Sequence, residues 1–182
     1  MGWDAIVFGE VRVSERNLEA WLTASCAPSG WGDWPAGLEG SLAPSSPEAL
    51  MEELGTTPLQ PHEFLDVSRE GAKVSLRGML GQDAFLESRL QLATLVRSAE
   101  AFGGAGTLTF LGHRTVAFGY RLVVGWGGSR IRPLAPSEIP QVLWFLHRAG
   151  LDARAEGAIG QLLGVDARAT RKRGEPNPFT GW

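Results

Sequence analysis

The stretch QDAFLESRLQLATLVRSAEAF, residues 82–102, carries the strongest helical pattern in the chain. Its apolar side chains recur at helical spacing and form one broad stripe of Phe85, Leu86, Leu90, Ala93, Val96 and Ala99. The opposite side is expected to be polar and includes Glu87, Gln91 and Thr94. About 20 residues rising 1.5 Å each give a helix of roughly 30 Å, which is long enough to cross a whole β-sheet. We therefore predict a central helix that ends at Gly103.

Two predicted β-hairpins flank this helix in the sequence. The first spans residues 63–80, with its turn at Glu70 and Gly71. Its second strand alternates apolar and polar side chains, which is typical of an antiparallel sheet with one buried face. The second hairpin spans residues 107–125, and one face of its second strand is apolar: Val116, Phe118, Tyr120, Leu122 and Val124. We expect helices to pack on the buried face of this sheet.

A strand and two helices are expected before the first hairpin. Residues 4–13 combine a short apolar run with alternation, which indicates a strand. Residues 15–25 place their apolar side chains on one stripe, so a helix is predicted there with Ser14 as its N-cap. A second, short helix over residues 48–54 follows Ser46, another good N-cap.

Further elements are expected after the second hairpin. Residues 126–129 form a turn, and residues 130–134 suit an edge strand because Pro133 cannot donate to a ladder. A helix is predicted over residues 138–148, followed by a weaker one over residues 152–163.

This order of elements predicts an α+β fold. We expect a single α+β domain over residues 1–164, followed by a C-terminal tail over residues 165–182. Its mainly antiparallel sheet is built from the two hairpins, packs against the long central helix and is accompanied by C-terminal helices. The pattern leaves the order of the strands open.

Composition narrows the class of protein. With 182 residues and 43% hydrophobic content, the chain has enough apolar material for a full core without disulfides or metals. Cys26 is the only cysteine, which excludes a disulfide framework within the chain. No apolar run is long enough to span a bilayer, so we expect a soluble, cytoplasmic protein without a membrane partner. The net charge of −3 argues against nucleic acid as the partner.

The sequence carries no motif for catalysis, metal binding or phosphate binding. The three histidines, His62, His113 and His147, have no recognisable catalytic neighbours, and Cys26 lies in no cysteine-hydrolase signature. Clustered metal ligands are missing from the sequence as well. We therefore expect no catalytic residue, no cofactor and no metal.

The segment of residues 26–44 is the most suggestive feature for function. It is rich in Gly, Pro and Ser, and long loops of this kind are uncommon unless they are functional or flexible. Trp31 and Trp34 lie within it, flanked by Asp33 and Glu39, which is the composition of a protein-binding hot spot. The alternatives are a lid that folds over the core and a platform on which a ligand stacks.

The leading hypothesis is a non-catalytic protein-binding domain, such as a small cognate inhibitor or a toxin-neutralising immunity protein. Trp31, Asp33, Trp34 and Glu39 would contact the partner, and the acidic balance suits a basic one. One alternative is a small enzyme whose site is assembled from scattered carboxylates and a histidine. Another is a subunit that assembles with copies of itself through Phe179 and Trp182 in its tail.

Overall fold

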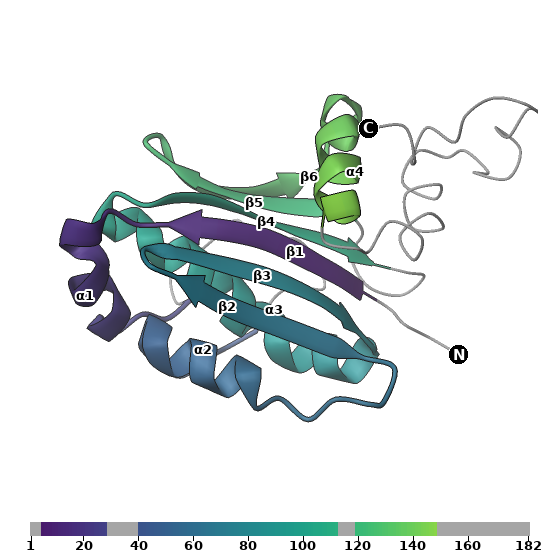
Figure 1. Cartoon of the computed structure of the whole chain (residues 1–182), viewed down its shortest axis with the longest axis horizontal. Coiled ribbons are helices and arrows are strands. Elements are labelled where there is room, and N and C mark those ends of the chain that lie inside the picture. The colour runs from purple at the N-terminus through teal and green to yellow at the C-terminus, as the bar shows by residue number, and fades with distance from the viewer. Residues whose placement is uncertain (1–4, 29–39, 113–118, 149–182) are drawn as a thin grey trace, which may run out of the picture.

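The computed structural model describes residues 5–28, 40–112 and 119–148, and these residues form an α+β domain (Figure 1). Its six-stranded sheet has the order β2–β3–β1–β4–β5–β6, and every pair of neighbours is antiparallel. The strands are β1 (Ala5–Arg12), β2 (Phe64–Glu70), β3 (Lys73–Leu80), β4 (Ala105–Gly112), β5 (Tyr120–Gly125) and β6 (Gly128–Pro133). The helices are α1 (Glu15–Thr23), α2 (Pro47–Gly55), α3 (Gln82–Ser98) and α4 (Ile139–Arg148), with short 3₁₀ turns η1 (Ala99–Phe102) and η2 (Pro136–Glu138). The predicted fold class is confirmed.

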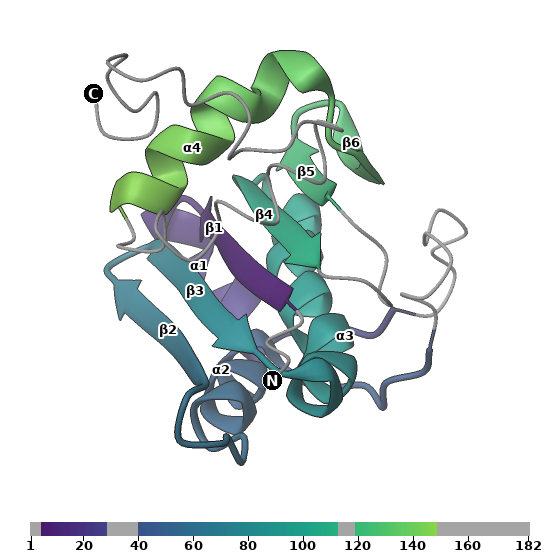
Figure 2. The same cartoon turned by 90° about the vertical axis from the view of Figure 1, so that its right-hand side faces the viewer.

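The helices lie on both faces of the sheet. Helices α1, α2 and α3 gather on one face, and α4 crosses the other (Figures 1 and 2). Alternate side chains of β5 show the two environments, because Leu122 is buried in the apolar core and Arg121 reaches helix α4. The sheet is therefore a middle layer whose second face is only partly covered by a helix.

Helix α3 has the predicted position across the sheet, but its buried side differs from the predicted stripe. Phe85 is buried and meets Phe110 of β4 edge to face, with ring centroids 5.8 Å apart. Leu86 is 36% exposed, whereas Thr94, expected on the polar side, is fully buried. The reason is that α3 packs on the sheet and also on α2, so its buried arc is wider than one stripe and is rotated toward α2. Leu92 and Leu95 are buried in that wider arc.

The two short helices show one N-cap that forms and one that does not. Ser46 accepts a hydrogen bond from the backbone N–H of Ala49 at 3.2 Å, as its type predicts. Ser14 occupies the N-cap position of α1, but its side chain makes no capping hydrogen bond, so that prediction is wrong. Helix α1 is held by burial instead, because Trp21 is fully buried and its indole N–H donates to the Ser98 hydroxyl at 2.8 Å.

The central strand β1 lies between the two predicted hairpins. Its Gly9 sits where β1 and β4 approach closely: a Cβ there would overlap the Thr107 carbonyl oxygen and lie 2.8 Å from the Leu108 Cα. The hairpin of β2 and β3 turns at Gly71, whose φ of 58° suits glycine. The predicted strand at residues 130–134 is confirmed as the edge strand β6.

Several predictions lie outside the described residues. These are the helix at residues 152–163, the tail at residues 165–182, and Val116 and Phe118 on the second hairpin. Within residues 5–28, 40–112 and 119–148, no helix is long and apolar enough to cross a lipid bilayer.

Candidate functional site

The face of the sheet that carries α4 combines charged side chains with buried apolar ones, such as Ile6 and Phe8 of β1 and Met79 of β3. Arg77 of β3 pairs with Asp66, its cross-strand neighbour on β2, with Nε and Oδ2 2.8 Å apart. Lys73 of β3 pairs with Glu10 of β1 at the same distance of 2.8 Å. All four side chains stay partly exposed. These charged side chains therefore form the exposed part of this face, beside its buried apolar residues.

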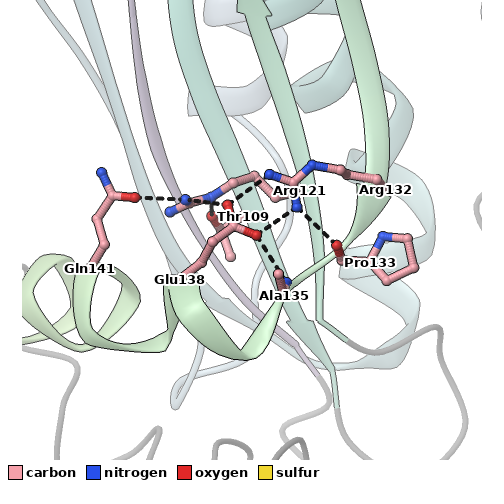
Figure 3. Close-up of polar contacts among 7 residues, drawn as sticks. All are labelled: Thr109, Arg121, Arg132, Pro133, Ala135, Glu138 and Gln141. Atoms are coloured by element: carbon pink, nitrogen blue, oxygen red, sulfur yellow. Dashed lines mark hydrogen bonds and ion pairs between the residues drawn. The ribbon is translucent and has the colours of Figure 1, made fainter.

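On the same face, Arg121 of β5 is enclosed by the start of α4. The residue is 3% exposed, so its guanidinium must be satisfied by protein groups. Its Nε donates to the Thr109 hydroxyl at 3.2 Å. Its Nη1 donates to Oε1 of Glu138 at 3.0 Å and to Oε1 of Gln141 at 2.9 Å (Figure 3). This arginine therefore ties the sheet to the first turns of the helix.

Glu138 is the centre of the cluster. Arg132 of β6 binds both of its carboxylate oxygens, at 2.5 and 2.8 Å, and the backbone N–H of Ala135 donates to it at 2.9 Å (Figure 3). Hydrogen bonds from Arg132 lower the pKa of Glu138 to about 2, with further help from Ala135 and Arg121, and outweigh the opposing effect of burial. The carboxylate is therefore ionised at neutral pH, and a charged network fixes where α4 begins.

A groove of about 310 Å³ lies on the sheet beside the far end of this helix. Residues of β1, β2 and β3 make up most of its lining, and Arg148 at the end of α4 completes it. Its charged lining consists of Glu10, Asp66, Lys73, Arg77 and Arg148. The charged cluster around Glu138 and the groove at Arg148 are thus at opposite ends of one helix.

Arg148 is oriented by an aromatic side chain of its own helix. Its guanidinium carbon lies 4.8 Å from the ring centroid of Trp144, a cation–π contact between residues one turn apart. Trp144 is 42% exposed. The end of α4 therefore presents a tryptophan and an arginine, two residue types that are enriched in protein-binding hot spots.

Trp126 is the most exposed large apolar side chain of the described residues. It occupies the two-residue turn between β5 and β6, and its exposed fraction is 104%. In the sequence it was visible only as a member of a predicted turn. No periodic pattern distinguishes a tryptophan that projects into solvent from one that folds back on the core.

The residues that the sequence singled out are not among those brought together here. Trp31, Asp33, Trp34 and Glu39 lie outside the described residues, as do Phe179 and Trp182. Sequence reasoning missed Arg121 and Glu138, because a pairing across 17 positions between a strand and a helix leaves no local signal.

The cysteine and the two histidines of the described residues lie on different segments of the chain. Cys26 donates its thiol to the Ser45 carbonyl oxygen at 2.9 Å, and burial raises its pKa. His62 and His147 are exposed on separate elements. Among the described residues, no three His, Cys, Asp or Glu side chains are placed to hold a metal ion.

Comparisons with known proteins assign no relative to this chain. No protein-family model, no curated protein and no solved structure matches it. The function therefore has to be inferred from the surfaces and contacts described above.

Proposed function

We propose that this chain is a non-catalytic protein-binding domain. The observation that carries the proposal is Trp126, whose exposed fraction of 104% places the whole indole in water. Tryptophan brings a large apolar area and one N–H donor, and it is among the residues most enriched at binding hot spots. An indole displayed in this way gains its stabilising contacts when a partner covers it.

The turn itself does not require a tryptophan. Gly125 and Gly128 are cross-strand partners that close the hairpin, and Gly128 takes the left-handed conformation with φ of 91°. Around Gly125 and Gly127 there is open space, with no atom within 4 Å of where a Cβ would lie. The indole therefore projects from a paired hairpin into solvent.

Small cognate inhibitors and toxin-neutralising immunity proteins are the class that fits this proposal. The net charge of −3 suits a basic partner, since complementary charge speeds encounter. Trp31, Asp33, Trp34 and Glu39 remain the proposed second contact, on the strength of the sequence. Among the described residues, no contact favours the enzyme or the self-assembling subunit over this function.

The test is affinity capture from a lysate of the source cells with three proteins: wild type, Trp126→Ala and Leu86→Ala. Leu86 is the matched control, because it is also a large exposed apolar residue but lies on α3. We expect wild type and Leu86→Ala to retain one stoichiometric protein. Trp126→Ala should lose it, with an affinity at least about tenfold weaker, as for truncation of a hot-spot residue.

Two results would overturn this proposal in different ways. Equal capture by Trp126→Ala would remove Trp126 as the anchor, and a wild-type lane without a stoichiometric protein would remove the protein-binding function. Thermal unfolding guards against a folding defect: a fully exposed side chain should change the free energy of unfolding by less than about 0.5 kcal/mol.

A further inference from the structure

We infer that the groove beside α4 binds an acidic side chain of the partner protein, an inference that rests on the protein-binding function proposed above. The groove is open to solvent on the face of the sheet that carries α4, and three strands and one helix contribute to it. Its volume of about 310 Å³ matches the lower end of the roughly 300–1,000 Å³ that is typical of ligand sites.

The charge of the lining selects for an anion. Three cations, Lys73, Arg77 and Arg148, line the groove with only two carboxylates, Glu10 and Asp66. Each carboxylate already pairs with one cation, Glu10 with Lys73 and Asp66 with Arg77. The remaining charge is that of Arg148, which has no carboxylate partner among the described residues. A negative group from a partner would complete the pairing.

Arg148 is prepared to receive such a group. Its guanidinium carbon lies over the Trp144 ring, 4.8 Å from the centroid, and a guanidinium that stacks on an aromatic ring keeps N–H groups available at its edge. A carboxylate can accept two parallel hydrogen bonds from that edge. Because Trp144 already restricts the guanidinium, less conformational entropy is lost when the carboxylate binds.

Neighbouring donors are available for the same anion. Arg77 uses Nε to bind Asp66, which leaves its two terminal nitrogens without a partner among the described residues. Ser68 and Ser75 face each other across β2 and β3 and both line the groove. The groove thus offers hydroxyl and guanidinium donors and a net positive charge. This suits a carboxylate better than an ammonium group, which would need hydrogen-bond acceptors.

The test is an NMR titration of the full nitrogen-15-labelled chain with a hexaglutamate peptide. The measured quantities are the chemical shifts of the Nε–Hε signals of the protein's arginines. We expect the signals of Arg148 and Arg77 to shift and that of Arg130 to stay, since Arg130 lies on β6 at the far edge of the sheet. Hexalysine should leave all three unchanged. Arg148→Gln should weaken hexaglutamate binding about two- to fivefold, as for a partly exposed ion pair, and Arg130→Gln should not.

Several outcomes would overturn the inference. They are the absence of a shift at millimolar hexaglutamate, an equal shift of all exposed arginines, and equal effects of hexaglutamate and hexalysine. A shift of Arg148 that follows protein concentration without peptide would identify a second copy of the chain as the occupant.

The captured partner separates this inference from the proposed function. If Arg148→Gln binds that partner as wild type does while Trp126→Ala loses it, the groove is not the acid-binding site and the protein-binding function stands. If wild type captures no partner, the function itself fails, whatever the peptide does.

Discussion

On the face toward α3 the sheet is covered by buried apolar side chains, whereas on the face toward α4 a charged cluster joins it to a helix beside a smaller set of buried apolar residues. Phe85 and Phe110 represent the first face, where ring packs against ring. Arg121, Glu138 and Arg132 represent the second, where four hydrogen bonds with defined donors and acceptors join β5 and β6 to the helix region.

The difference shows how the two faces of one sheet can be held in place by different kinds of contact. Apolar burial has no preferred direction and contributes in proportion to the area removed from water, so it supplies most of the stability. Buried charges contribute less net free energy to folding. They are stabilising only when each donor meets its acceptor, so they define the position of the helix relative to the sheet. The first face therefore holds the fold together, and the second places α4 beside an open groove.

The largest effect is expected from Phe85→Ala on the apolar face. Removing this buried ring should lower the free energy of unfolding by about 3–5 kcal/mol, through lost transfer energy and the cavity left behind. Its neighbour Leu86 is 36% exposed, and Leu86→Ala should lower it by less than about 1 kcal/mol. Urea denaturation followed by circular dichroism measures both. Similar losses for the two variants would contradict the assignment of Phe85 to the core face.

Glu138→Gln should have a smaller effect, confined to the second face. The substitution leaves Arg121, only 3% exposed, without its counter-charge, and we expect a loss of about 2 kcal/mol. Hydrogen exchange is the measurement, because the amide of the buried Val142 on α4 should lose protection while those of β1 keep theirs. A loss of protection spread evenly over the sheet would mean that the cluster does not act on α4 alone.

Acid should reduce this difference between wild type and Glu138→Gln. The pKa of Glu138 is lowered from 4.5 to about 2, so its ion pairs contribute fully above pH 4.5 and their contribution is lost as the pH falls toward 2. Since the carboxylate is not fully shielded from solvent, we expect the gap between the variants to narrow by about 1–2 kcal/mol over that range. Urea unfolding at a series of pH values tests it, and parallel stability curves would be inconsistent with a charged Glu138.

The smallest effect is expected at the groove. Asp66→Asn removes the ion pair with Arg77, but these side chains are 43% and 51% exposed and water screens their attraction. The free energy of unfolding should change by less than about 0.5 kcal/mol, and by less still in high salt. A loss above 1 kcal/mol, beyond this range for an exposed pair, would show that the groove contributes to stability.

Most of the described secondary-structure elements could be predicted from local patterns, and the main error concerns which side of α3 is buried. The periodicity of residues 82–102 locates a helix, but a period does not tell how wide an arc the neighbours cover. Leu86 and Thr94 were misplaced for that reason, since α2 packs on a side of α3 that the pattern assigns to solvent. The capping error at Ser14 is similar, because a suitable side chain at the right position need not form the bond.

The candidate site was less predictable than the fold. Its charged residues alternate with core residues along β1, β3 and β5. The sequence pattern therefore predicts only that they lie on a solvent-exposed face of the sheet. The prediction at Trp31, Asp33, Trp34 and Glu39 stays a prediction, because these residues lie outside the described ones. Trp126 carried a signal, an aromatic residue within a glycine-rich turn, but its exposure appeared only in three dimensions.

By itself the sequence determined that this chain builds an antiparallel sheet with a long helix across one face, because alternation and helical periodicity depend on neighbours close in the chain. Only the tertiary structure decided that β1 lies between the two hairpins and that α4 returns to the opposite face. Those choices depend on contacts such as Arg121 with Glu138, between residues far apart in the sequence. They also place Arg148 over β1, β2 and β3, and so form the groove.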